Sequence, residues 1–177
     1  MIKKEMLEAL NAQVNEELYS AYLYAAMRAY FEAQNLKGFS NWMRIQTEEE
    51  LFHARKIVEF IFERGGHAAF KAIKGPDADW ASPLDAFKAS YKHECHISEC
   101  INKLATLALK HDDHAARVFL EWFVTEQVEE ESNADQMVQN LTRMQDAPGG
   151  LFLLDREAGA RTLSPMVVAS VSGAPAA

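Results

Sequence analysis

The stretch EEELFHARK, residues 48–56, lies within a long segment whose apolar residues recur every three to four positions. Glu50 and His53 fall on the apolar stripe of that segment, in line with Phe39, Trp42, Gln46, Ile57 and Phe60. A stripe that faces a protein core is normally apolar, because burying a charged group costs free energy unless the group is paired. A carboxylate and an imidazole at these positions therefore need a partner inside the core.

Four segments of the chain share this period. It predicts helices over residues 4–34 and 38–64, a third helix that begins at Ser82-Pro83 and ends near residue 111, and a fourth over residues 113–144. Alternating steps of three and four residues are typical of one buried helical face, and proline is common at the first helical position. No segment shows sustained strand alternation, so we expect an all-α fold.

The connections between these helices indicate their topology. The first two helices are joined by residues 35–37 and the last two by residues 111–113, so each pair should be antiparallel. The 17 residues from 65 to 81 separate the pairs and are rich in Gly, Pro and Asp. Extended, they reach about 56 Å, whereas a helix over 38–64 is about 40 Å long. The sequence thus predicts a four-helix bundle with one long crossover.

Beyond the bundle, the segment LFLLDREAG, residues 151–159, predicts a short fifth helix. Residues 160–177 are rich in Ala, Ser and Pro, and we expect them to form a mobile C-terminal tail. The domain is therefore expected to cover residues 1–159.

Composition narrows the class of protein. The chain has 177 residues, of which 49% are hydrophobic and 25% charged, as in an ordinary globular domain. Its formal net charge of −8 argues against nucleic acid as a partner and favours cations. No signal-peptide core or apolar run of membrane length is present, so a cytoplasmic protein with no membrane partner is expected. Cys95 and Cys100 are predicted to stay reduced.

Each of the four helices carries a glutamate on its apolar stripe: Glu17, Glu50, Glu94 and Glu130. These residues and His53 lie 14 to 19 residues from the turn that joins their helix to its neighbour. At about 1.5 Å per residue, all five should lie within about 8 Å along the bundle axis. Buried carboxylates at one height require cations, and oxygen ligands with one nitrogen suit iron or manganese. Bridging carboxylates suit a pair of ions.

The alternative is that these glutamates are solvated neighbours of the apolar stripes, which is the usual case for a single Glu. Glu-x-x-His alone occurs by chance in many helices. One Glu per helix at one height, together with that motif, favours the metal site. His93, His96 and Cys100 could share a face of the third helix, but surface histidines and a half-buried thiol explain them better. Asp113 is a candidate N-cap of the fourth helix.

Several motifs resemble those of the non-haem bacterial ferritins: NEELYSAYLY at 15–24, EEELFHARK, the region of Glu94, and FVTEQVEEES at 123–132. The resemblance covers about residues 1–159 and implies a ferritin-like di-iron domain. It implies a dinuclear centre within one subunit, bridged by Glu50. The ligands it assigns are Glu17, Glu50 and His53 for one iron, and Glu50, Glu94 and Glu130 for the other.

The same resemblance gives roles to residues around this centre. Gln127 stands beside the ligands, where related di-iron bundles have a second histidine. Tyr24 and Trp122 match aromatic residues next to the centre, where a tyrosine hydroxyl can hydrogen-bond a ligand carboxylate. A third iron site of bacterial ferritins maps onto Glu49, Glu126 and Glu129, with Glu130 shared.

The function that this resemblance implies is iron storage with ferroxidase activity. Fe²⁺ would be oxidised to Fe³⁺ by O₂ or H₂O₂ at the dinuclear centre. Ferric oxyhydroxide mineral would then be kept inside a hollow shell of 24 copies of the chain. Haem is not expected, because Phe52 stands where bacterioferritins carry the methionine that binds it.

Two other functions remain open from the sequence. A di-iron enzyme acting on an organic substrate or peroxide would need a pocket beside the metals, and its iron uptake would stop at about two ions per chain. A purely structural or signalling bundle would become more stable, and lose no activity, if leucine replaced Glu50 and His53.

Overall fold

The computed structural model describes residues 2–172, which contain helices and loops but no strand. The helices are α1 (Lys4–Ala33), α2 (Lys37–Glu63), α3 (Pro83–Lys110), α4 (His114–Met144), α5 (Gly150–Ala158) and α6 (Pro165–Ser172). The first five match the segments predicted from the sequence. None of the helices in this part of the chain has the length and apolar character needed to cross a membrane.

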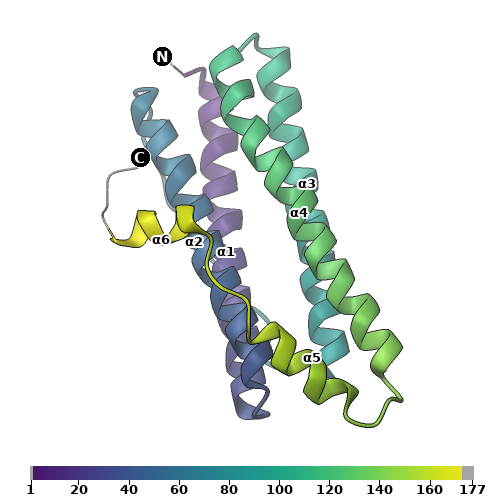
Figure 1. Ribbon diagram of the computed structural model, residues 1–177. Helices are drawn as coiled ribbons and strands as arrows, with labels where there is room; N and C mark the ends of the chain where they lie inside the picture. The colour runs from purple at the N-terminus through teal and green to yellow at the C-terminus, as the bar shows by residue number, and fades with distance from the viewer. Residues whose placement is uncertain (1, 173–177) are drawn as a thin grey trace.

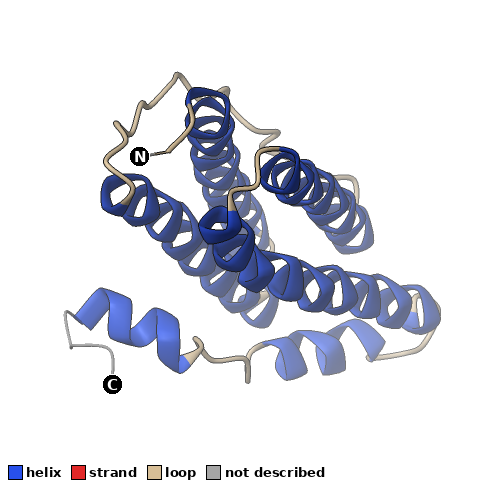
Figure 2. Cartoon of the chain, turned by 90° about the horizontal axis from the view of Figure 1, so that it is seen from above, coloured by secondary structure: helices blue, strands red, loops and turns tan. Residues whose placement is uncertain are grey.

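The four long helices form two antiparallel pairs, α1 with α2 and α3 with α4 (Figure 1). The crossover from residue 64 to residue 82 runs from one end of the bundle to the other, so α2 and α3 are parallel. The predicted four-helix bundle with one long crossover is therefore confirmed. Figure 2 shows α5 and α6 following one another along the outside of the bundle.

Residues in the left-handed conformation end three of the four long helices. Asn35 (φ 58°) and Asp112 (φ 52°) follow α1 and α3, and Gly65 (φ 69°) follows α2. After each of them a backbone amide turns back to a carbonyl five residues earlier, as with Leu36 and Phe31 at 3.0 Å. Asparagine, aspartate and glycine tolerate the left-handed conformation best, so these residues permit the sharp turns.

Two side-chain caps fix the starts of α3 and α4. Ser82 Oγ accepts a hydrogen bond from the Asp85 amide at 3.1 Å, just before Pro83. Asp113 Oδ1 accepts one from the Ala116 amide at 3.1 Å, so the predicted N-cap is confirmed. Both guanidinium nitrogens of Arg64 also donate to Asp113 at 3.0 Å, which ties the end of α2 to the start of α4.

The core is divided into two apolar clusters, one toward each end of the bundle. One cluster includes Met6, Leu10, Ile57, Ile101 and Leu120. The other includes Tyr24, Phe31, Phe39, Phe87 and Leu141. Along each long helix the buried glutamate lies between these two clusters, at Glu17, Glu50, Glu94 and Glu130. The two apolar clusters therefore form the core toward each end of the bundle, and the four glutamates form a polar layer between them.

The C-terminal segment, which was expected to form a mobile tail over residues 160–177, contains a short helix that the sequence did not predict. It contains helix α6, which lies beside α2 (Figure 1). Ser164 Oγ accepts from the Val167 amide at 3.4 Å, and the side chain of Val167 is only 2% exposed. A serine–proline start and one buried valine favour this short helix on α2, while the mobility of the tail stays a prediction. Residues 173–177 of the expected tail lie outside the described part of the chain.

Gly38 allows α5 to cap α2. The Phe39 amide donates to Asp155 Oδ1 at 2.9 Å, so a carboxylate of α5 lies at the N-terminus of α2. A Cβ atom at residue 38 would lie 1.5 Å from the backbone carbonyl oxygen of Asp155. We expect Gly38→Ala to destabilise the fold by about 1–3 kcal/mol. The measurement is thermal unfolding, with limited proteolysis reporting on α5. Gly75→Ala is the control, because a Cβ there meets nothing within 4 Å.

Candidate metal centre

The five predicted ligands meet at the middle of the bundle. Glu17 comes from α1, Glu50 and His53 from α2, Glu94 from α3 and Glu130 from α4. None of the five residues is more than 7% exposed. Their ligand atoms form two groups, Glu17–Glu50–His53 and Glu50–Glu94–Glu130, and within each group the atoms lie within 4.8 Å of one another. Glu50 belongs to both groups, which is the geometry of two adjacent cation sites with one shared carboxylate.

The carboxylates of this centre are electrostatically unfavourable without cations. Burial raises the pKa of Glu17 to about 7, and burial together with Glu130 and Glu94 raises that of Glu50 well above its ordinary value. The pKa of Glu130 is raised in the same way, first by burial and then by Glu94. Oε1 and Oε2 of Glu50 and Oε2 of Glu130 are buried and accept no hydrogen bond. The centre therefore offers oxygen lone pairs to a cation.

His53 supplies the one nitrogen donor. Burial lowers the pKa of its imidazole to about 3, with a further contribution from Lys56. The ring is therefore neutral at pH 7, and a neutral ring leaves one nitrogen free to bind a metal. Its Nδ1 lies 3.3 Å from Glu50 Oε2, and its ring packs edge-on against Trp122 and Phe123. The aromatic residues hold the imidazole beside the carboxylates.

Neighbouring side chains hold two of the ligands in place. Gln127 Nε2 donates to Glu94 Oε2 at 3.3 Å, and the Tyr24 hydroxyl donates to Glu94 Oε1. Burial raises the pKa of Tyr24 well above its ordinary value, so its hydroxyl keeps the proton it donates. Gln13, which the sequence reasoning did not single out, donates to Glu17 Oε1 at 2.9 Å. The sequence feature that could have indicated this role is the position of Gln13 one helical turn before Glu17, where the two side chains can meet.

Tyr24→Phe removes the hydroxyl that donates to Glu94 and keeps the buried ring. Residues that orient a metal ligand typically contribute 10- to 100-fold to metal affinity, so we expect a divalent cation to bind beside Glu94 about tenfold more weakly. The measurement is calorimetric titration of the metal-free protein with Zn²⁺. Tyr22→Phe makes the same chemical change at an exposed position of α1 and should leave the affinity unchanged. An equal affinity in both variants would contradict this role for Tyr24.

The predicted third site has a more open geometry. Glu49 and Glu126 are half-buried and Glu129 is exposed. Burial raises the pKa of Glu49 and of Glu126, and in both cases repulsion from Glu129 contributes. Unlike the two groups above, these carboxylates do not converge within 4.8 Å in the described structure. One oxygen of Glu49 is instead 2.7 Å from Nη2 of Arg161.

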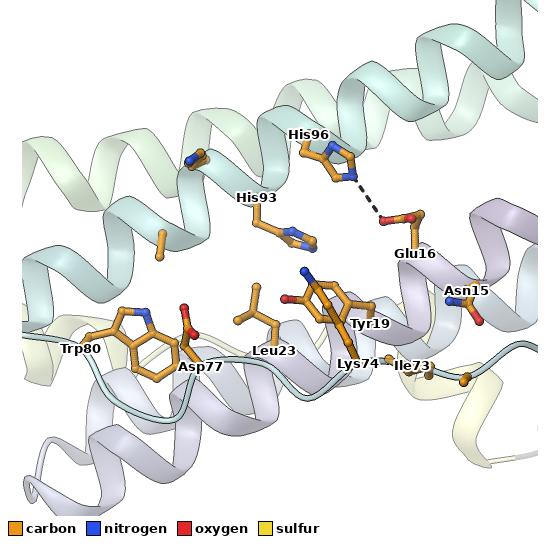
Figure 3. Close-up of a pocket in the computed structure, with 13 residues that line it drawn as sticks. Asn15, Glu16, Tyr19, Leu23, Ile73, Lys74, Asp77, Trp80, His93 and His96 are labelled. Atoms are coloured by element: carbon orange, nitrogen blue, oxygen red, sulfur yellow. Dashed lines mark hydrogen bonds and ion pairs between the residues drawn. The ribbon is translucent and has the colours of Figure 1, made fainter.

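His93 and His96 of α3 line a cavity of about 770 Å³ between α1, α3 and the crossover (Figure 3). His93 Nε2 is 2.7 Å from Ser20 Oγ, whereas His96 Nε2 is 3.3 Å from Glu16 Oε2. Cys100 Sγ lies 3.7 Å from His96 Nε2, and both Cys95 and Cys100 are free thiols. These groups do not form a candidate metal cluster among the described residues. His96 is exposed and Cys100 half-buried, as expected, whereas His93 is half-buried and not a surface histidine.

A bundle with one crossover and inward-facing glutamates on all four helices, one of them in Glu-x-x-His, defines the class of ferritin-like di-iron carboxylate proteins. The family profile of the ferritin-like domain matches residues 7–144. The chain belongs to the ferritin family, as a non-haem bacterial ferritin. The resemblance noted from its motifs is thereby confirmed, and iron storage is the function that this membership supports.

Relatives in two organisms carry the name bacterial non-heme ferritin. The protein of Staphylococcus aureus (strain USA300) is 41% identical over 162 residues, which cover 92% of this chain and 98% of the relative. That of Staphylococcus epidermidis is 40% identical over 93% of this chain and 99% of the relative. An open pore ferritin from the archaeon Archaeoglobus fulgidus has a similar crystal structure, with a TM-score of 0.90 and 45% identity over 92% of this chain and all of that one.

Proposed function

We propose that this protein is a ferroxidase that oxidises Fe²⁺ at its mid-bundle centre and stores the ferric product as mineral. The observation that carries the proposal is the pair of buried ligand groups that share Glu50, with no protein cation among them. Glu17, Glu50 and His53 would hold one iron ion, and Glu50, Glu94 and Glu130 the other. Iron is the substrate here, and two adjacent ions can deliver two electrons to one oxidant.

The carboxylate ligands favour the oxidation of Fe²⁺ through their negative charge. Carboxylate oxygens are hard ligands and stabilise Fe³⁺ more than Fe²⁺. Two Fe²⁺ ions lose one electron each, and O₂ gains two electrons and two protons to give H₂O₂. With H₂O₂ as the oxidant, two electrons and two protons give two water molecules instead. Protons displaced from Glu17 and Glu50 when iron binds are available nearby, because burial raises the pKa of both carboxyls.

Mineral storage requires an enclosed volume, and we infer that the chain assembles into a hollow homo-oligomeric shell of 24 subunits. Helix α5 supports this assembly, because Leu151, Phe152 and Leu153 are 41%, 68% and 47% exposed in the single chain. Three consecutive exposed apolar side chains are typical of a surface that another subunit covers. Size-exclusion chromatography with light scattering measures the number of subunits directly.

We also infer a third iron site at Glu49, Glu126 and Glu129, with Glu130 shared. The support is electrostatic, because burial and mutual repulsion raise the pKa of Glu49 and of Glu126. Glu49 also precedes Glu50 directly in α2, so an ion held there would be next to the dinuclear centre. Such a site would accept iron ions that leave the dinuclear centre for the interior of the shell.

Stopped-flow absorbance on the iron-free protein tests the proposed function. Fe²⁺ is added in air at two and then at several hundred ions per chain. Rapid ferric formation at two ions, followed by continued uptake into soluble mineral, is the expected result. Oxidation that stops at about two ions would identify a di-iron enzyme instead. A rate equal to that of buffer alone would overturn the ferroxidase assignment.

A further inference from the structure

Arg161 forms an ion pair with a carboxylate of the proposed third site. It lies three residues after the end of α5, and its Nη2 is 2.7 Å from Glu49 Oε2. The two side chains are only 22% and 15% exposed, so water screens the ion pair less than it would at the surface. A positive charge thus already sits on a carboxylate that a third metal ion would need.

Arg161 makes two other contacts, but one nitrogen of its guanidinium group remains without a partner. Its guanidinium carbon lies 4.5 Å from the centre of the Trp42 ring, and its backbone carbonyl accepts from Asn41 Nδ2 at 3.1 Å. Its Nη1, however, is buried and has no hydrogen-bond partner. Only one of the two terminal nitrogens is therefore engaged by a carboxylate, which leaves this ion pair weaker than a bidentate one.

The segment that follows Arg161 crosses α2 a second time. Arg55 Nη2 lies 3.3 Å from Ser170 Oγ, and Val167 between the two contacts is buried. The strap, residues 161–170, thus contacts α2 at Glu49 and again at Arg55. Figure 1 shows α6, which is part of this segment, beside α2. Arg161 also lines a hollow of about 430 Å³ that includes the polar side chains of Asn133 and Gln136. A guanidinium displaced from Glu49 has space and acceptors there.

We propose that Arg161 is a tethered cation that occupies Glu49 when no third metal ion is bound and sets the affinity of that site. This inference rests on the proposed function, because it regulates the third site beside the dinuclear centre. A divalent cation must displace the guanidinium from Glu49 before it can use that carboxylate. Arg161 thereby keeps the third site weaker than the dinuclear centre, so that iron fills the centre first and passes on only when supply is high.

Calorimetric titration of the iron-free protein with Zn²⁺, which is not oxidised, tests the proposal. We expect wild type to bind two ions per chain tightly and a third more weakly. In Arg161→Gln the third ion should bind about tenfold more tightly, because its competitor is gone. Arg161→Lys keeps the charge without the planar fork and should lie closer to wild type. Arg156→Gln removes an exposed positive charge of α5 outside the strap and should leave all three affinities unchanged.

Glu49→Gln provides the reciprocal control. It should abolish the third ion in both the wild-type and the Arg161→Gln backgrounds, while the two tight ions remain. An Arg161→Gln variant that binds the third ion no more tightly than wild type, or shows no third ion, would overturn the role of Arg161. Absence of the two tight ions in wild type would instead overturn the proposed dinuclear centre. If Arg161→Gln fails to assemble, hydrogen exchange of α6 in wild type and in Glu49→Gln decides.

Linkage gives a second measurement that does not depend on affinity. If Arg161 and the third ion compete for Glu49, binding of the ion must release the strap by the same free energy. Hydrogen exchange of the α6 amides should therefore become faster when Zn²⁺ is raised from two to three ions per chain. In Glu49→Gln the exchange should be fast already and insensitive to Zn²⁺. Exchange in wild type that does not change at the third ion would contradict the competition.

Discussion

Replacing Glu50 and His53 together by leucine is expected to abolish the rapid oxidation of Fe²⁺ and to make the metal-free protein more stable. Glu50 belongs to both ligand groups and His53 supplies the only nitrogen, so the variant loses the shared ligand. Changes around metal ligands cost 10- to 100-fold, and loss of the ligands themselves should slow the reaction by more than about 100-fold. Stopped-flow absorbance at about two Fe²⁺ per chain measures this.

The stability of the same variant should change in the opposite direction. Both residues are at most 3% exposed, and neither oxygen of Glu50 accepts a hydrogen bond. Apolar replacement of buried charges commonly stabilises a protein by about 1–4 kcal/mol, which thermal unfolding of the metal-free protein would show. Leucine at Glu99, whose side chain is 71% exposed, is the control and should leave oxidation unchanged. Normal oxidation by the double variant would show that the centre lies elsewhere.

The metal-free protein is expected to lose stability as the pH rises from about 5 to 7.5. Glu17 has a pKa of about 7 in the folded chain and an ordinary value of 4.5, so the folded state keeps a proton that the unfolded state has lost. Its contribution is full below pH 4.5 and is lost as the pH rises through 7. The shift is worth on the order of 3 kcal/mol, or roughly 5–10 °C in melting temperature. Glu50, Glu94 and Glu130 are shifted in the same direction.

Two histidines oppose this trend over part of the range. Burial lowers the pKa of His53 to about 3 and that of His93 to about 4 from 6.5. Their contribution is full above pH 6.5 and is lost as the pH falls, so they act against the carboxylates only below 6.5. The pKa of Asp113 is lowered by Arg64, and the resulting pH dependence lies below pH 4 and outside the window. The four carboxylates therefore outweigh the two imidazoles.

Calorimetric melting at pH 5.5 and 7.5, with chelator and with two Zn²⁺ per chain, measures the pH effect. Metal binding needs deprotonated carboxylates, so Zn²⁺ should raise the melting temperature more at pH 7.5 than at 5.5. Glu50→Gln should weaken the pH dependence of the metal-free protein. Glu8→Gln makes the same change on the exposed face of α1 and should not. Stability of the metal-free protein that rises from pH 5.5 to 7.5 would contradict the charge balance described here.

Much of the fold was predictable because helical periodicity is a local property. The stripes placed the four long helices nearly at their observed bounds, and the length of residues 65–81 indicated the crossover. The constant rise per residue converted sequence positions into heights, so Glu17, Glu50, Glu94 and Glu130 could be placed in one layer. The structure brings these same residues together within its two ligand groups.

Other features were not accessible in this way. Helix α6 was missed because a stretch rich in Ala, Ser and Pro carries little periodic signal, and its packing depends on Val167 meeting α2. The role of Gln13 was missed because a polar residue one turn from a ligand is common on any helix. For the proposed third site, the spacing of Glu49 and Glu126 gave no sign that Arg161 would pair with Glu49.

The sequence by itself determined the four helices, their order and direction, and the height of the buried carboxylates. These features follow from local spacing and from the fixed geometry of the helix. Only the tertiary structure decided which charges meet across the chain, as with Arg161 and Glu49, which are 112 residues apart. That contact depends on the path of the chain after α5, where no repeating pattern exists and the conformation is set by what the chain packs against.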